Sequence, residues 1–214
     1  MTHGIFATGD DILPSKLNKG LVQERYTNHT MVHEAYITTS LIGSGTYMEY
    51  PYGYYNVLDT GISSFSHASV FTVDSCTLSS SKFIIMNYIM KTHTAGAGAG
   101  LVTRIGLINN ITNFDNYSQC CFVNNSGGSW YVYTSNATSL QSTSLSISNG
   151  DKLTIYATNT FVNYYVNKYL VVSHTLYIPT LPLFSGYGVR TSSANTSTRT
   201  LESKYFDLRI IYNI

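Results

Sequence analysis

The sequence predicts an all-β protein, a two-sheet antiparallel β-sandwich, and three observations lead to this fold class. Short runs of alternating apolar and polar residues recur along the chain, separated about every 8 to 15 residues by turns that contain Gly, Asn or Ser. Only 11% of the residues are charged, and 19 of the 214 are Tyr. Strands rich in Thr, Tyr, Val and Ile suit this composition, and long helices do not. We therefore expect ten to twelve short strands in two packed sheets.

The clearest strands lie between Ser148 and Pro179, where three runs with a period of two follow one another as a β-meander. Asn residues occupy the joints at 149–151, 159–160 and 167–168, and Asn tolerates the positive φ of tight hairpin turns. The side chains expected to point into the sandwich are Leu153, Ile155, Val162, Val166, Leu170 and Val172. Truncation of Leu170 is therefore expected to cost roughly 2–5 kcal/mol. Thr154, on the opposite face, is expected to be exposed and tolerant.

The rest of the chain is predicted to form an N-terminal arm or attachment segment over residues 1–24 and one sandwich domain over 25–214. Further strands are expected at 30–42, 69–76, 82–91, 101–108, 120–124, 129–134, 186–189 and 204–212. The almost wholly apolar run 82–91 is typical of a central strand. Residues 47–55 read as a loop or bent edge because Pro51 cannot donate to a ladder. The Gly-rich segment 94–100 reads as a loop within the domain.

The meander also resembles a recurring segment of concanavalin A-like jelly-roll domains, whose strands read roughly "gdkl.i", "v.fyvNg" and "lv.thtt.iP". The corresponding stretches here are Asp151–Ile155, Phe161–Asn167 and Leu170–Pro179, with Lys168 where the family has Gly. The version ending in Ile-Pro-Thr resembles tail, fibre and coat proteins of viruses and phages. Residues Gly9–Asn18 resemble the opening "sGd.lpas.lN" of such proteins, although an ordinary loop followed by a short helix capped by Ser15 is an equal alternative.

Composition disfavours several classes of partner. The formal net charge of +1, without clustered Lys or Arg, gives no case for nucleic acid or anionic lipid. No apolar run approaches the ~20 residues that span a bilayer, so no membrane insertion is expected. The N-terminus lacks the features of a secretion signal. No CxxC, HxH or HExxH pattern occurs, so neither a metal nor a cofactor is expected. Cys76 could pair with Cys120 or Cys121, but buried free thiols are the favoured interpretation.

Residues that could carry chemistry are few, and no catalytic residue is predicted. The four Glu stand apart in the sequence, and nothing resembles the "ExDxE" strand of the glucanases that share this fold, so we expect no enzyme. A sugar-stacking surface is the one candidate binding site, since aromatic rings accept the apolar face of a pyranose. Its candidate residues are Tyr47, Tyr50, Tyr52, Tyr54, Tyr55 and Trp130. The alternative is that these rings only pack an interface or cover an edge.

The resemblance implies a non-enzymatic structural protein of a virus or phage particle, as a capsid, spike or receptor-binding fibre subunit. Such a protein would assemble in the host cytoplasm with other virion proteins, attach to the host and bind a host-surface glycan. The Tyr-rich, weakly charged composition predicts a homo-oligomer, with a trimer favoured. A lectin-like carbohydrate-binding module is the alternative function, and a glycoside hydrolase is the weaker one.

Overall fold

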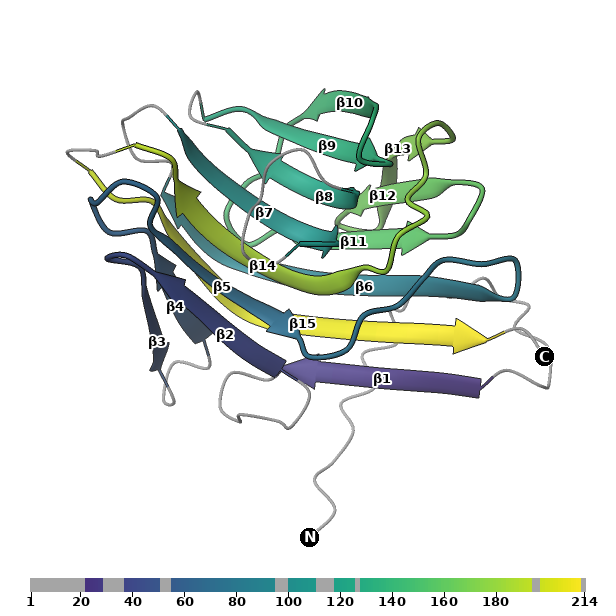
Figure 1. The fold of residues 1–214 in the computed structure, drawn as a ribbon, viewed down its shortest axis with the longest axis horizontal. Coiled ribbons are helices and arrows are strands. Elements are labelled where there is room, and N and C mark those ends of the chain that lie inside the picture. Colours follow the sequence, from purple (N-terminus) through teal and green to yellow (C-terminus); the bar gives the residue numbers. More distant parts are fainter. Residues whose placement is uncertain are drawn as a thin grey trace, which may run out of the picture.

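The computed structural model describes residues 22–28, 37–50, 55–94, 100–110, 118–125, 128–193 and 197–212, whose strands form two stacked antiparallel sheets (Figure 1). Sheet A has the strand order β13 (Tyr169–His174), β12 (Val162–Val166), β11 (Lys152–Ala157), β6 (Lys82–Thr94), β15 (Thr200–Tyr212), β4 (Tyr55–Asp59) and β3 (Thr46–Tyr50), and β1 (Val22–Asn28) pairs with β15 beside β4. Sheet B has the order β10 (Leu140–Leu145), β9 (Trp130–Ser135), β8 (Gln119–Asn124), β7 (Leu101–Ile108), β14 (Phe184–Thr191), β5 (His67–Thr72) and β2 (Ile37–Ile42). The predicted fold class is confirmed. No helix among the described residues is long and apolar enough to cross a membrane.

Most of the predicted strands are present with shifted ends. The central position expected for 82–91 is confirmed, because β6 lies between β11 and β15. The Tyr-rich stretch expected to be a loop or bent edge instead contributes β3 and β4, with β3 at the edge of sheet A and residues 51–54 outside the described part. Of the strand expected at 30–42, the described part is β2. Residues 1–21, which include the segment 9–18, also lie outside the described residues.

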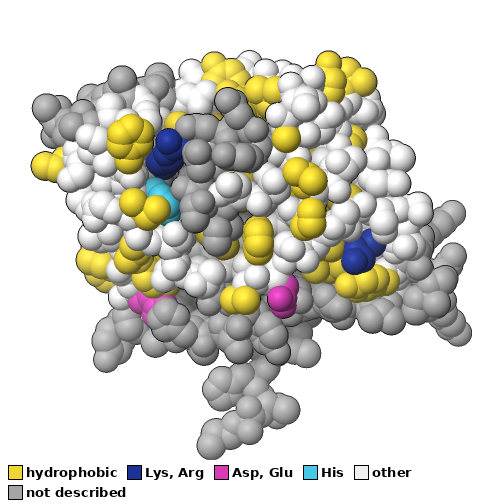
Figure 2. All heavy atoms as spheres, in the orientation of Figure 1, with side chains coloured by type: hydrophobic (Ala, Val, Ile, Leu, Met, Phe, Trp, Pro, Cys, Tyr) yellow, Lys and Arg dark blue, Asp and Glu magenta, His cyan; other side chains and the backbone are white. Residues whose placement is uncertain are grey.

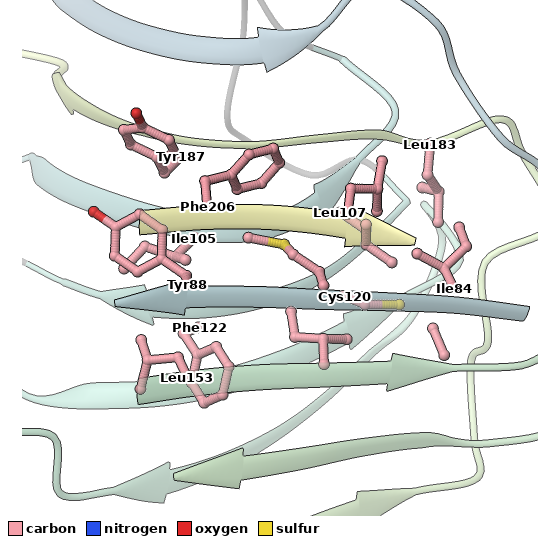
Figure 3. Close-up of a cluster of buried hydrophobic side chains, with 14 of the residues drawn as sticks. Ile84, Tyr88, Ile105, Leu107, Cys120, Phe122, Leu153, Leu183, Tyr187 and Phe206 are labelled. Atoms are coloured by element: carbon pink, nitrogen blue, oxygen red, sulfur yellow. The ribbon is translucent and has the colours of Figure 1, made fainter. Parts of the chain in front are cut away.

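The core lies between the two sheets, where inward side chains of both interdigitate (Figure 3). Tyr88 of β6 packs against Tyr187 of β14 with ring centroids 5.0 Å apart, and Phe122 of β8 meets Tyr164 of β12 edge to face at 5.4 Å. These aromatic pairs each join one sheet to the other. Burial raises the pKa of Tyr187 to about 12, and its hydroxyl accepts a hydrogen bond from Asn56 Nδ2 at 2.8 Å.

The meander forms β11, β12 and β13, but the prediction that Leu170 is buried is wrong. Tyr164 pairs with Val172 while Tyr165 pairs with Leu170, so Val171 is the extra residue of a β-bulge. The bulge shifts Leu170 by one position, opposite the outward Tyr165, and Leu170 is 54% exposed. Val172, which lies beyond the bulge, packs against the core as predicted.

The environment predicted for Thr154 is also wrong, since this residue is 2% exposed. Its hydroxyl donates to Asn87 Oδ1 at 2.8 Å, and Asn87 Nδ2 donates to Asp207 Oδ2 at 3.4 Å. Arg209 Nε lies 2.9 Å from the same carboxylate oxygen. These side chains form a buried polar network on the outer face of sheet A, where alternation alone predicts exposure.

The cysteines are all free and buried. Cys120 belongs to the core between the sheets, while Cys121 lies on the outer face of sheet B, so the two adjacent side chains point in opposite directions. The preferred interpretation of the cysteines as buried free thiols is therefore confirmed. Burial raises the pKa of the Cys121 thiol to about 12, which leaves it protonated at neutral pH.

Candidate functional site: an aromatic surface at the edge of sheet A

The hairpin of β3 and β4 arranges the described tyrosines on both faces of sheet A. Tyr50 and Tyr55 are cross-strand partners on the outer face, and their rings stack with centroids 4.8 Å apart and planes within 8°. Tyr47, on the inner face, packs against the core and donates its hydroxyl to Glu49. Burial, followed by that hydrogen bond, raises the pKa of Tyr47. Tyr52 and Tyr54 lie outside the described residues.

Trp130 does not join these tyrosines. It is 6% exposed in the core, and its ring centroid lies 5.0 Å from that of His93. The reason is its place in β9, where Trp130, Val132 and Thr134 point inward. The structure therefore does not bring Trp130 together with Tyr50 and Tyr55, because its side chain lies between the sheets and theirs lie on the outer face of sheet A.

Lys91 and Glu202 extend the tyrosine pair across the outer face. β6 and β15 shift register between Glu202 and Ser203, so Lys91 has no partner in the ladder and is the extra residue of a bulge. Its Nζ lies 3.1 Å from the centroid of the Tyr55 ring and 3.1 Å from Glu202 Oε2. Burial alone would lower the pKa of Lys91, but Glu202 and Tyr55 together raise it, so the ammonium is charged at neutral pH.

We call Tyr50, Tyr55, Lys91 and Glu202 the tyrosine surface. Within it, Lys91 lies against one face of Tyr55, and Tyr50 stacks on that ring as well. Tyr50 is 40% exposed on β3, the end strand of sheet A. The exposed Tyr50 ring forms an apolar platform, with the Lys91 ammonium and the Glu202 carboxylate nearby. Such a surface can stack a sugar ring and hydrogen-bond its hydroxyls.

A second carboxylate shares this face. Asp59 of β4 pairs with Thr200 in the ladder, and Glu202 pairs with Val57, so the two acids are same-face neighbours on adjacent strands. Diagonal neighbours of this kind have Cα atoms about 7–8 Å apart. Asp59 Oδ1 accepts a hydrogen bond from Gly61 N at 2.6 Å. Sequence reasoning missed Lys91, Asp59 and Glu202 as neighbours because more than a hundred residues separate Glu202 from the other two.

The outer face of sheet B has different side chains from those of the tyrosine surface. Arg104 Nη1 donates to Gln119 Oε1 at 2.9 Å, and Ser40 Oγ lies 3.0 Å from His67 Nε2. The centre of this face is an apolar cluster whose members are at most 2% exposed, namely Phe71, Ile108, Cys121 and Val123. Such a buried centre offers no open aromatic platform, and we therefore place the candidate site on sheet A.

A metal centre has no basis among the described side chains, where no three His, Cys, Asp or Glu gather closely enough to hold an ion. Burial, followed by the charge of Arg199, lowers the pKa of His93 to about 4. Arg199 is itself fully buried and donates from Nη1 to the Asn124 carbonyl oxygen at 2.6 Å. These two residues lie between the sheets and serve packing and hydrogen bonding there.

No protein-family model and no curated protein matches this chain. Solved structures do match it over most of its length. The carbohydrate recognition domain of Emp47p aligns at 9% identity, with 88% of this chain and 96% of that one covered and a TM-score of 0.59. The β-glucanase of Bacillus licheniformis aligns at 8% identity, with 92% and 100% covered and a TM-score of 0.61. The endo-1,3-β-glucanase of Streptomyces sioyaensis aligns at 9% identity, with 92% and 99% covered and a TM-score of 0.61.

The fold is a concanavalin A-like jelly roll. At identities below 10%, the likeness establishes this architecture and leaves the function of the chain to its own residues. The resemblance found in the meander is thereby confirmed at the level of the fold. Its virion part, with coat, spike and fibre roles, receives no support from these neighbours, which are a carbohydrate recognition domain and glucanases.

The expectation that this concanavalin A-like protein is not an enzyme is contradicted by the same comparison, because two of the three similar structures described above are glucanases. That expectation depended on the absence of a single strand with alternating acids. Carboxylates from two different strands can also share one face, as Asp59 and Glu202 do. The lack of an "ExDxE" strand is therefore not a sound reason to exclude catalysis.

Proposed function

We propose that the protein binds carbohydrate at the tyrosine surface. The observation that carries this proposal is the parallel stack of Tyr50 on Tyr55, held by Lys91 and Glu202 at the edge of a concanavalin A-like sandwich. A carbohydrate recognition domain among the structural neighbours supports the same class of ligand. The two rings already stack on each other without a ligand, so binding costs less side-chain freedom than it would for two separate rings.

The charged pair gives this platform its polar part. Glu202 has a side chain about 25% exposed and Lys91 one about 37% exposed, so both reach solvent while holding each other in place. A sugar stacked on Tyr50 would find a carboxylate that accepts hydroxyl protons and an ammonium that donates to ring or hydroxyl oxygens. The platform and the pair together favour a neutral or weakly acidic saccharide.

The test is isothermal titration of the protein with a panel of β-1,3-glucan, β-1,4-glucan, mannan and alginate oligosaccharides. We expect Tyr50→Ala to weaken the best ligand at least tenfold, which corresponds to about 1.4 kcal/mol. Tyr50→Phe should keep most of the affinity because the ring remains. Tyr131→Ala, on the outer face of sheet B, is the control and should have no effect. Equal affinities for wild type and Tyr50→Ala would refute this site.

Cleavage of the bound polysaccharide is the second candidate function, favoured by the shared face of Asp59 and Glu202. Glycoside hydrolysis uses two carboxylates, about 5–5.5 Å apart in retaining and 6.5–9.5 Å apart in inverting enzymes. As diagonal neighbours on adjacent strands, Asp59 and Glu202 have Cα atoms about 7–8 Å apart, which allows their carboxyl groups to act on the same bound sugar. Wild-type protein should then release reducing ends from a β-glucan, and both Glu202→Gln and Asp59→Asn should abolish the release. Wild-type protein that releases none from the whole panel would remove this candidate and leave binding untouched.

The virion context stays a separate prediction, carried only by the sequence patterns at 9–18 and in the meander. Mass spectrometry of purified particles of a virus or phage whose genome encodes this chain would test it. Glycan binding by a particle subunit would serve attachment to the host surface, so the binding proposal and the virion prediction can both hold.

A further inference from the structure

A group of exposed apolar side chains gathers at the end of the sandwich opposite the tyrosine surface. Tyr169 is 77% exposed, Leu176 is 55% exposed and Leu170 is 54% exposed. Six large side chains belong to the group, which we call the β13 edge: Leu140, Tyr169, Leu170, Val171, Leu176 and Tyr177. Figure 2 shows hydrophobic side chains along the upper rim, where Figure 1 places β10 and the turn after β13.

The β13 edge is continuous because hydrogen bonds tie its parts together. Gln141 Oε1 of β10 accepts from Leu176 N at 3.1 Å, and Thr143 Oγ1 lies 3.0 Å from His174 Nε2. The other nitrogen, His174 Nδ1, lies 2.9 Å from Thr134 Oγ1 of β9. These contacts hold the end strands of the two sheets beside each other, so their exposed side chains form one surface.

β13 is also an unpaired sheet edge. Among the described strands it pairs only with β12, which leaves one side of its backbone without a ladder partner. Natural proteins usually protect such an edge with Lys, Pro or a bulge. Here the bulge at Val171 is present, but no Asp, Glu, Lys or Arg occurs from residue 169 to residue 184. An uncharged edge rimmed by large apolar side chains is typical of a surface that a partner covers.

We propose that a second copy of this chain covers the β13 edge, with the two β13 strands antiparallel across a twofold axis. A twofold axis makes the two copies of an edge strand run antiparallel, so the same surface of each copy contacts the other in an isologous interface. Six side chains that are about half exposed supply on the order of 600 Å² per copy. The pair then buries about 1,200 Å², at the lower limit of stable interfaces. This proposal does not depend on carbohydrate binding.

The test is the mass in solution, measured by light scattering coupled to gel filtration at micromolar concentration. We expect 47.4 kDa, twice the 23.7 kDa of one chain. Val171→Lys and Leu170→Lys each place a like charge near the twofold axis and should return a monomer with an unchanged circular-dichroism spectrum. Ile62→Lys, at a residue 56% exposed in the loop after β4, is the matched control and should remain a dimer.

Several results would overturn the proposal. A wild-type monomer at 100 micromolar would do so, as would a dimer that persists in both lysine variants. A trimer would also contradict it, because twofold pairing of identical edges closes at two copies, and it would instead support the trimer favoured by the composition. Since both variants alter side chains that are already exposed, loss of fold in either is not expected. Backbone amides of β13 should, in addition, exchange hydrogen more slowly at high protein concentration.

Discussion

Single side chains on the outer face of sheet A differ widely in what they contribute to stability. Thr154 is 2% exposed and donates to Asn87, which itself donates to the fully buried Asp207. Leu170 lies on the same face with 54% of its surface exposed. A buried acceptor that loses its donor keeps its desolvation penalty, whereas a half-exposed Leu leaves no cavity when truncated.

The first prediction follows from this contrast. Thr154→Ala should destabilise the protein by about 1–3 kcal/mol, because Asn87 Oδ1 loses its partner. Leu170→Ala should cost under about 1 kcal/mol in monomer stability, measured by urea midpoints at a concentration below dimerisation. Thr154→Ser, which retains the hydroxyl, is the control and should lie near wild type. A larger loss for Leu170→Ala than for Thr154→Ala would contradict the bulge at Val171.

The second prediction concerns pH. Burial lowers the pKa of His67, His93 and His174, and the pKa of His93 falls to about 4. An unfolded His titrates near 6.5, so below that pH the unfolded chain binds protons that the folded chain does not. Stability should therefore be complete above about pH 6.5 and fall as the pH drops toward 4. Thermal midpoints across this range measure it, and a flat profile would count against the buried histidines.

The variant His93→Gln separates the contribution of His93 to the pH dependence of stability from those of His67 and His174. His93 Nε2 lies 2.9 Å from Thr103 Oγ1, a contact that an amide can replace. This variant should lose part of the acid sensitivity while keeping most of the stability at pH 7.5.

At the scale of elements, turns and bulges decide which face each residue of a strand occupies. Asn167 and Lys168 join β12 to β13 with φ of 50° and 75°, the positive values that a two-residue hairpin turn of the I′ type requires. Asn167 suits this turn, and its Oδ1 also accepts from Lys152 N at 2.9 Å. Lys168 carries a Cβ in a conformation that favours Gly.

The third prediction is that Lys168→Gly stabilises the protein by roughly 0.5–1 kcal/mol, since relief of the strained φ outweighs the entropy that Gly adds to the unfolded chain. Chemical denaturation measures the change. Lys168→Ala removes the charge and keeps the strain, so it should not stabilise. If both variants raise the midpoint equally, the effect comes from the charge and not from the backbone.

Local sequence predicts strands well where one pattern dominates. The run Leu101–Ile108 is found as β7 with the predicted ends, because its apolar side chains suit a strand buried on both faces. β10, LQSTSL, was missed because its two apolar residues give no clear alternation. The bulges at Val171 and Lys91 arise from how neighbouring strands pair, and no local pattern encodes that pairing. Leu170 was misplaced for that reason.

At the scale of the whole molecule, the sequence likewise predicts the local part of the candidate site and not the part that depends on strand pairing. The Tyr-rich stretch indicated an aromatic surface, and Tyr50 and Tyr55 do lie together on one face. Its charged members come from β6 and β15, which reach β4 only through the long-range order of sheet A. Trp130 was assigned to the surface by residue type alone, and its inward direction depends on the register of β9 against β8. The direction in which a side chain points and the residues beside it depend on the tertiary fold, so composition could not predict them.

β3 and β13 lie at opposite ends of sheet A. In the proposed dimer the twofold axis runs perpendicular to the joined sheets, so both tyrosine surfaces face the same side. Thirteen strand spacings of about 4.8 Å separate the two β3 strands, roughly 60 Å along the sheet. Two sites at that separation cannot share a short oligosaccharide, but they can engage two chains of a polysaccharide layer at once. Such a dimer would bind soluble fragments weakly and a glycan-coated surface with an avidity 10²–10⁴ times higher, although each site makes the same contacts.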